Sequence, residues 1–164
     1  MRSWIFQGNP KRFRDINGYF REVMRSGRVA GWSVTKEAHQ QLLEDAIGDE
    51  VWFWRSDGGK AGSGGVIAHG HVCSKLYDGS LKRPSILWVE ATENPELLRA
   101  PFVEVLLTEA RVEKREGMVL RSRLVGHAEL SDLRILRWAQ ETNYLLDEHH
   151  AAALRRCWNW VERR

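Results

Sequence analysis

Residues 48–59, with the sequence GDEVWFWRSDGG, constrain the fold more than any other segment. Turn residues stand on both sides of four consecutive apolar residues, a pattern that predicts a short strand with a turn at each end. Because side chains alternate along a strand, Val51 and Phe53 face one side of the sheet and the two tryptophans face the other. A glycine-rich loop follows, and residues 65–72, GVIAHGHV, predict the returning strand of a hairpin.

The other regular segments that the sequence predicts are short and of both kinds. The patterns indicate strands at residues 4–7, 102–113 and 118–124, helices at residues 13–26, 35–47 and in the last part of 142–160, and a short helix or turn at 131–138. Asp15 and Thr35 are the predicted N-caps of the first two helices. Residues 73–101 form a long connection that contains one extended piece, SILWVEAT. This mixture implies an α+β fold with a curled sheet as its core.

The composition is that of a soluble globular domain, with 43% hydrophobic and 29% charged residues. The 164 residues fit one domain, 1–164, with a sizeable core. No apolar run reaches the length of about 18 residues that a membrane-spanning helix needs, and the first residues lack the features of a signal peptide. We therefore expect a cytoplasmic monomer in which Cys73 and Cys157 remain reduced thiols. A net charge of +3 is a mild indication of an anionic partner.

The residue types that carry out catalysis or bind metals form no recognisable motif. His69 and His71 share one face of their strand, but no further ligand stands at a spacing typical of zinc sites. Neither cysteine lies near a histidine in the sequence, and the carboxylates show no pairing suited to acid–base chemistry. The run DGGKAGSGG lacks the spacing of a phosphate-binding loop and joins two predicted strands. We therefore expect no enzyme activity, no metal and no other cofactor.

Eight tryptophans are more than a chain of this length usually contains. Most of them lie in predicted strands or in the last helix, and both Trp158 and Trp160 are expected to pack that helix into the core. Trp32 and Trp88 lie instead in segments that the pattern predicts to be irregular. Two such tryptophans form either the walls of a cage for a flat base or separate packing under their own loops. Spacing alone favours loop packing.

Several segments, in their order and spacing, resemble the EVE domain, a member of the PUA-like superfamily that is related to the YTH domain. They are WIFQGNP, GWS after the first predicted helix, GDEVWFWRS, GGVIAHGHV and, near the end, ELSDLRILRWAQETNYLLDEHHAAAL. The resemblance covers nearly the whole chain and implies a PUA-like curled β-barrel flanked by helices. It also implies a nucleic-acid reader that flips a modified base into an aromatic cage.

The resemblance further implies which residues form the cage. Trp32 and Ser33 match the tryptophan and the small hydroxyl residue that follow the first helix in YTH domains. Trp88 matches the second cage tryptophan. Asn9 matches an asparagine that helps to read the edge of the base in some YTH domains.

Other residues are expected around the cage. By a looser match, its third, aliphatic wall falls near Leu97 or Leu98. We expect the pocket to be lined in part by Trp54, Gly8 and Gly31. We expect phosphate contacts from Lys11, Arg12, Arg14, Lys82 and Arg83.

The resemblance leaves the identity of the base open, because relatives read methylated or hydroxymethylated cytosine or N6-methyladenine, in DNA or in RNA. An alternative is a recognition or interaction subunit of a nuclease or RNA-processing complex, in which the tryptophan cage binds a protein or a small ligand. If the cage reads a base, Trp32→Ala is expected to abolish binding to modified oligonucleotides and to leave the chain folded.

Overall fold

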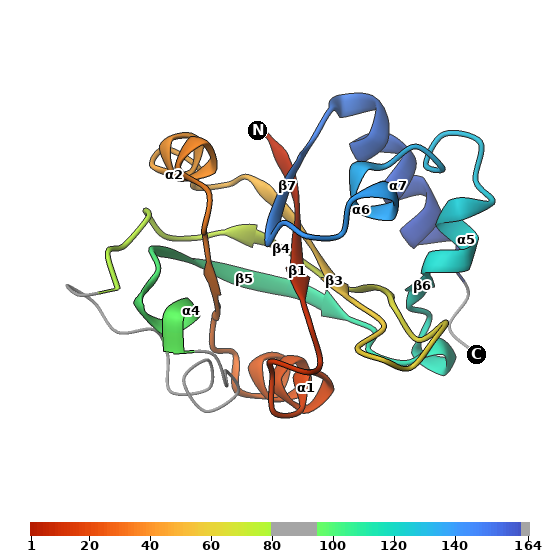
Figure 1. The fold of residues 1–164 in the computed structure, drawn as a ribbon, viewed down its shortest axis with the longest axis horizontal. Helices are drawn as coiled ribbons and strands as arrows, with labels where there is room; N and C mark the ends of the chain where they lie inside the picture. Colours follow the sequence, from red (N-terminus) through yellow and green to blue (C-terminus); the bar gives the residue numbers. More distant parts are fainter. Residues whose placement is uncertain (80–94, 162–164) are drawn as a thin grey trace.

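A curled β-sheet runs through the centre of the molecule, and helices cover both of its faces (Figure 1). The computed structural model describes residues 1–79 and 95–161. Its strands are β1 (Ser3–Gly8), β2 (Ala30–Ser33), β3 (Glu50–Arg55), β4 (Gly65–Val72), β5 (Phe102–Ala110), β6 (Val119–Leu120) and β7 (Asn143–Leu146). They follow the order β2-β5-β4-β3-β1-β7, and β6 pairs with β4.

The pairing of β3 determines how the sheet is built. Strands β3 and β4 form the antiparallel hairpin that the sequence predicts, with a shift of register between Phe53 and Trp54. On its other side β3 pairs in parallel with β1, so the first strand of the chain enters the sheet beside the hairpin. Strand β7 then pairs antiparallel with β1 and extends the sheet beyond the N-terminal strand.

The helices are short, and local capping explains where the first one lies. They are α1 (Ile16–Ser26), α2 (Glu37–Leu43), α4 (Pro95–Arg99), α5 (Arg121–Val125), α6 (Arg134–Arg137) and α7 (Glu148–Trp160), with a 3₁₀ turn η1 (Lys114–Glu116). The Asp15 carboxylate accepts a hydrogen bond from Gly18 N at 2.9 Å, and Gly27 ends α1 in the left-handed conformation with φ 64°. Within the described ranges, no helix has the length and apolar character needed to cross a membrane.

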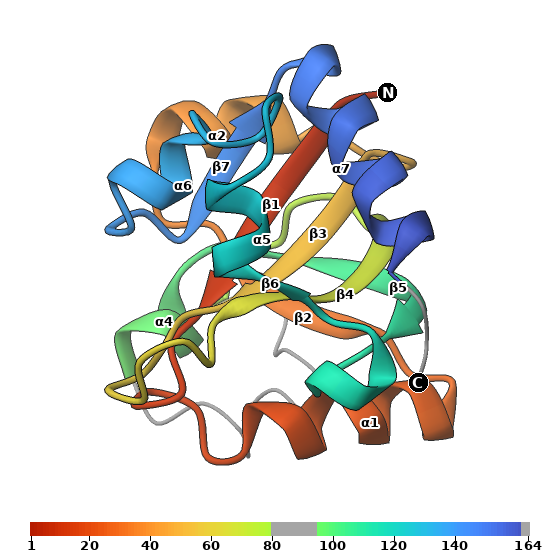
Figure 2. The same cartoon turned by 90° about the vertical axis from the view of Figure 1, so that its right-hand side faces the viewer.

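Two hydrophobic clusters, one on each face of the sheet, form the core. Val51 and Phe53 of β3 belong to the first cluster, which packs against α1 and the end of α2. Trp52 and Trp54 belong to the second cluster, which packs against α5, α6 and α7. Figure 2 shows α1 below the sheet and these three helices on the other side. The alternation along β3 is confirmed, and so is the α+β fold with a curled sheet.

Several local predictions are wrong because tertiary packing overrides a weak pattern. The second helix begins at Glu37 with Lys36 rather than Thr35 as its N-cap. Residues 118–124 form two strand residues and then α5, because β6 finds partners on β4 for just those two residues. Strand β7 is absent from the prediction, and Trp160 is 75% exposed rather than packed.

A buried carboxylate, Glu50, ties the start of β3 to α7. It is 3% exposed and accepts a 2.6 Å hydrogen bond from Ser3 Oγ and a 3.0 Å hydrogen bond from Arg155 Nε. His69 Nε2 lies 3.1 Å from Glu50 Oε1. Burial raises the pKa of the Glu50 carboxyl, but these hydrogen bonds outweigh that effect and lower the pKa from 4.5 to about 2.

We predict that this carboxylate makes stability depend on acid pH. Because the pKa is depressed in the folded protein, the contribution is complete above the unfolded pKa and is lost as the pH falls toward the folded pKa. At about 1.4 kcal/mol per pKa unit, Glu50 contributes on the order of 3 kcal/mol of pH-dependent free energy of unfolding. Chemical denaturation between about pH 5 and about pH 2 should show a shallower pH dependence for Glu50→Gln than for the parent chain.

Glu37→Gln, which removes an exposed carboxylate from α2, is the matched control and should keep the parent's pH dependence. If Glu50→Gln has the same pH dependence as the parent chain, this account of Glu50 is wrong.

Candidate functional site

A cavity of about 300 Å³ opens where the end of β1, the end of β2 and the segment before β7 meet. The turn after β1 contributes its first wall, β2 its second and residues 139–142 its third. The lining residues are Gln7, Asn9, Arg12, Phe13, Trp32, Ser33, Ala139, Gln140, Glu141 and Thr142. The cavity therefore brings together Trp32, Ser33, Asn9 and Arg12 from the sequence prediction.

Trp32 lies in a strand, so the prediction of an irregular loop at this position is wrong. It pairs with Val103 of β5, and its side chain is 1% exposed. The segment AGWS has too few apolar residues to predict a strand, yet the β5 ladder satisfies its backbone hydrogen bonds. That pairing is what allows so large a side chain to be buried at a position that local sequence reasoning assigns to a loop.

Aromatic rings surround the Trp32 indole. The Phe13 ring lies parallel to it, with centroids 5.2 Å apart and planes at 9°. Phe53 meets it edge-on at 5.0 Å and Phe20 is tilted at 5.9 Å. One face of the indole is therefore covered by Phe13, and Trp32 is both a wall of the cavity and part of the core. Removing such a side chain costs about 3–5 kcal/mol, so Trp32→Ala perturbs the fold as well as the cavity.

Side-chain and backbone hydrogen bonds from Gln7 hold the third wall in place. Gln7 Nε2 donates to Ala139 O at 3.0 Å and to Glu141 O at 2.9 Å, and Gln7 N donates to Thr142 O at 2.7 Å. The sequence prediction did not assign residues 139–142 to the site. These residues belong to the segment ILRWAQETN, which supported the resemblance to EVE domains but was not assigned to the cage.

Two predicted polar residues also have structural partners. Asn9 Oδ1 accepts a hydrogen bond from Lys11 N at 3.0 Å and so shapes the turn that leads into α1. Ser33 is fully buried, and its carbonyl accepts a 3.0 Å hydrogen bond from Asn143 Nδ2. Both residues line the cavity, but their positions are determined by the surrounding backbone.

The cavity is lined by side chains of both positive and negative charge. Glu141 is held by Arg134 at 2.6 Å and by Lys36 at 3.6 Å, so its charge is balanced locally. Of the predicted phosphate contacts, Lys11, Arg12 and Arg14 are exposed in the turn before α1.

Some predicted residues lie elsewhere or beyond the described ranges. Trp54 does not line the cavity, because alternation places it in the cluster on the opposite face of the sheet. Gly31 is not a lining residue, and its carbonyl faces the Tyr19 hydroxyl at 3.4 Å. Leu98, on α4, packs against the first cluster rather than the cavity.

The predictions for Trp88, Lys82, Arg83 and the piece SILWVEAT fall outside the residues that the structure describes.

Metal binding finds no support in the part of the chain that the structure describes, where no group of three or more His, Cys, Asp or Glu side chains is arranged so that it could hold a metal ion. His69 Nδ1 lies 2.7 Å from Thr108 Oγ1 and its Nε2 contacts Glu50. His71 lies beside it, with ring centroids 5.2 Å apart. These histidines therefore belong to the polar packing around Glu50.

Comparison with known proteins identifies the fold. No protein-family model and no curated protein matches the sequence. A hypothetical protein from Leishmania major has a TM-score of 0.67 at 15% identity, over 97% of this chain and 95% of that one. Human THYN1 protein in complex with DNA containing 5-methylcytosine has a TM-score of 0.66 at 10% identity, over 96% and 98%.

The YTH domain of the Zygosaccharomyces rouxii MRB1 protein, in complex with N6-methyladenosine RNA, has a TM-score of 0.57 at 11% identity, over 98% of this chain and 88% of that one. At these identities the likeness concerns the fold. It confirms the fold that the resemblance to EVE and YTH domains implied.

Gly8 is expected to control how closely β1 approaches Trp32. A Cβ atom at this position would lie 2.5 Å from Ile16 Cδ1 and 3.1 Å from Trp32 Cη2. Gly8→Ala should therefore displace the Ile16 side chain and crowd the indole, and it should lower the free energy of unfolding by about 1–2 kcal/mol, as measured by chemical denaturation.

Gly126→Ala is the control, because the nearest atom to its added Cβ is Ser122 O at 3.6 Å, an ordinary contact. Its free energy of unfolding should stay within about 0.5 kcal/mol of the parent value. Equal effects of the two substitutions would contradict the close approach of Gly8 to Trp32.

Proposed function

We propose that this chain, which has the fold of EVE and YTH domains, binds nucleic acid that carries a modified base and holds that base in the cavity beside Trp32. The observation that carries the proposal is the cavity of about 300 Å³, in which aromatic and polar side chains meet. Pockets that bind small ligands have this combination of apolar walls and a few polar groups. A base is flat, and its edge carries hydrogen-bonding groups, so it suits such walls.

Two structures of similar fold support the proposal at the level of the family. The human THYN1 structure is a complex with DNA containing 5-methylcytosine. The Zygosaccharomyces rouxii YTH domain structure is a complex with N6-methyladenosine RNA. Both contain a modified nucleotide, and this favours a reader over a general nucleic-acid binder.

Stacking, burial of the modification and polar contacts contribute different amounts to affinity and selectivity. Extruding a base costs a few kcal/mol, and stacking on an aromatic ring returns about 1–3 kcal/mol. Burying one methyl group adds about 0.8 kcal/mol, which is roughly a fourfold preference. Stronger selectivity requires polar groups that a wrong base leaves without partners.

Gln7 is a candidate for this polar recognition. Its Oε1 atom is buried and has no hydrogen-bond partner among the described residues, whereas its Nε2 atom is occupied by two carbonyls. An amino group at the edge of cytosine or adenine is a donor that suits this acceptor. Trp88 remains our proposed second wall of the cage, as the resemblance implies.

Trp32→Phe is the sharper test of the cavity, because it keeps an aromatic ring in the core. We expect it to weaken binding to oligonucleotides that carry modified cytosine or adenine, and to reduce the ratio of affinities for modified and unmodified strands. Trp52→Phe is the matched control, since Trp52 is also 1% exposed but lies in the cluster on the opposite face.

Fluorescence anisotropy measures the affinity of both variants for a panel of modified and unmodified DNA and RNA oligonucleotides. Denaturation curves check that the two variants lose a similar amount of stability. If Trp52→Phe reduces the ratio as much as Trp32→Phe, the assignment of the cavity fails.

Lys11 and Arg12 should contribute phosphate contacts at the mouth of the cavity. For a single strand, each neutralised phosphate changes the slope of log affinity against log salt by about 0.7. The double variant Lys11→Ala/Arg12→Ala is expected to weaken binding and to reduce this slope by about 1.4 in a salt titration. An unchanged slope would remove these two residues from the proposed interface.

A further inference from the structure

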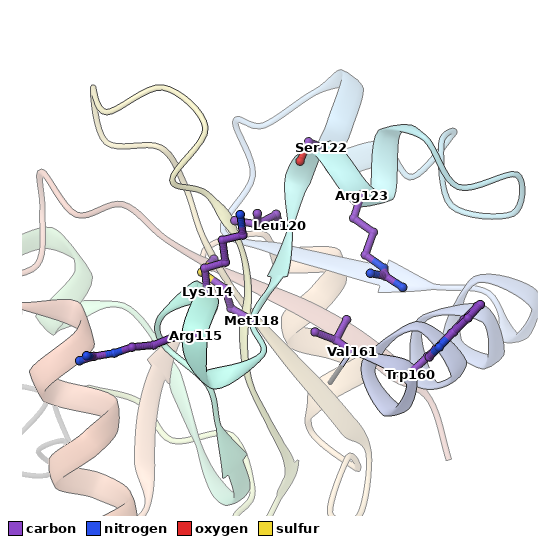
Figure 3. A pocket seen from close by; sticks show the side chains of 8 residues that line it. All are labelled: Lys114, Arg115, Met118, Leu120, Ser122, Arg123, Trp160 and Val161. Atoms are coloured by element: carbon purple, nitrogen blue, oxygen red, sulfur yellow. The ribbon is translucent and has the colours of Figure 1, made fainter. Parts of the chain in front are cut away.

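A second hollow, of about 930 Å³, lies where η1, β6 and the start of α5 meet the end of α7 (Figure 3). We call it the α7 groove. Its lining includes Lys114, Met118, Leu120, Arg123, Trp160 and Val161. None of these residues lines the cavity beside Trp32, so the groove is a separate feature of the surface.

The tryptophan of the groove, Trp160, does not pack in the hydrophobic core. Trp160 is the last residue of α7 and is 75% exposed, whereas Trp158 is 3% exposed and packs in the second cluster. Successive residues of a helix point in different directions, and the buried face of α7 includes Trp158 and Cys157 but not Trp160. The ring of Trp160 is therefore available to a partner.

One positively charged side chain lies beside this ring and another lies across the hollow from it (Figure 3). Arg123 Cζ lies 5.9 Å from the Trp160 ring centroid, and Lys114 lies across the hollow (Figure 3). Neither Lys114 nor Arg123 forms an ion pair with any carboxylate in the described ranges, although Arg115 Nε pairs with Glu113 at 2.7 Å. Met118, which is buried, and the partly buried Leu120 supply an apolar floor.

We propose that the α7 groove binds single-stranded nucleic acid, with a base stacked on Trp160 and the adjoining phosphates paired with Arg123 and Lys114. Grooves that combine an exposed aromatic ring with cationic side chains are typical of proteins that bind single strands. The stacking partner is any base, so the groove adds affinity without reading a modification. The proposal goes beyond the recognition of a modified base at Trp32.

The end of β3 connects the two binding surfaces. Ser56 N, just after β3, donates to Gly8 O at 2.9 Å, beside the cavity. Arg55, the last residue of β3, donates from Nη2 to Met118 Sδ at 3.5 Å, beside the groove. The end of β3 thus links the turn beside the cavity to a residue that lines the groove.

The test uses the full chain and oligonucleotides with and without a modified base. Trp160→Ala should weaken binding to both oligonucleotides by the same factor, roughly 5-fold to 150-fold, which corresponds to the loss of one stacked base. Lys114→Ala/Arg123→Ala should weaken both and should lower the salt slope by about 1.4.

The matched controls are Leu106→Ala, which removes a 51% exposed apolar side chain outside the groove, and Arg28→Ala/Lys75→Ala, which removes two exposed positive charges elsewhere. Leu106→Ala should leave affinity unchanged, and the charge control should have a smaller effect than Lys114→Ala/Arg123→Ala. Denaturation curves should show that Trp160→Ala folds as the parent does, because its side chain is exposed.

A 5-iodouracil oligonucleotide, irradiated in complex with the parent chain, is expected to crosslink to Trp160. Unchanged affinity of Trp160→Ala, or equal losses in the two charge variants, would overturn the proposal. A loss confined to the modified oligonucleotide would also overturn it. If Trp32→Phe leaves the preference for modified strands intact while Trp160→Ala weakens all strands, the groove stands and the cavity assignment fails.

Discussion

The burial of β3 on both faces is the constraint on which the rest of the structure depends. Four consecutive residues, Val51 to Trp54, are each at most 3% exposed. A strand of this kind requires a layer of side chains above and below it, so the chain must supply helices to both faces of the sheet. Helices α1 and α2 cover one face, and α5, α6 and α7 cover the other. The cavity and the α7 groove form at the borders of these two layers.

The cavity beside Trp32 shows how a core residue also lines a candidate binding site. Its indole packs on Phe13, Phe20 and Phe53, so its orientation is determined by the first cluster. A wall that is fixed before binding loses little conformational freedom when a ligand enters the cavity. Because the indole also belongs to the core, Trp32→Phe separates an effect on the proposed binding from an effect on stability better than Trp32→Ala does.

Local signals in the sequence predicted much of the fold but only part of the site. The hairpin of β3 and β4 and the cap at Asp15 follow from alternation and turn chemistry over a few residues. The resemblance identified Trp32 and Ser33, although the local pattern placed them in a loop. Residues 139–142 were missed because Gln7 reaches them across 132 positions, and no local pattern encodes such a pairing.

The sequence by itself determined the alternation of β3, the helix cap at Asp15 and the excess of tryptophans, because these depend on neighbours in the chain. The tertiary structure alone decided which tryptophans are available to a ligand. Trp32 is buried because β2 pairs with β5, and Trp160 is exposed because it lies outside the buried face of α7 that packs in the second cluster. Burial is a property of the packed layers, and those layers join segments that are far apart in the chain.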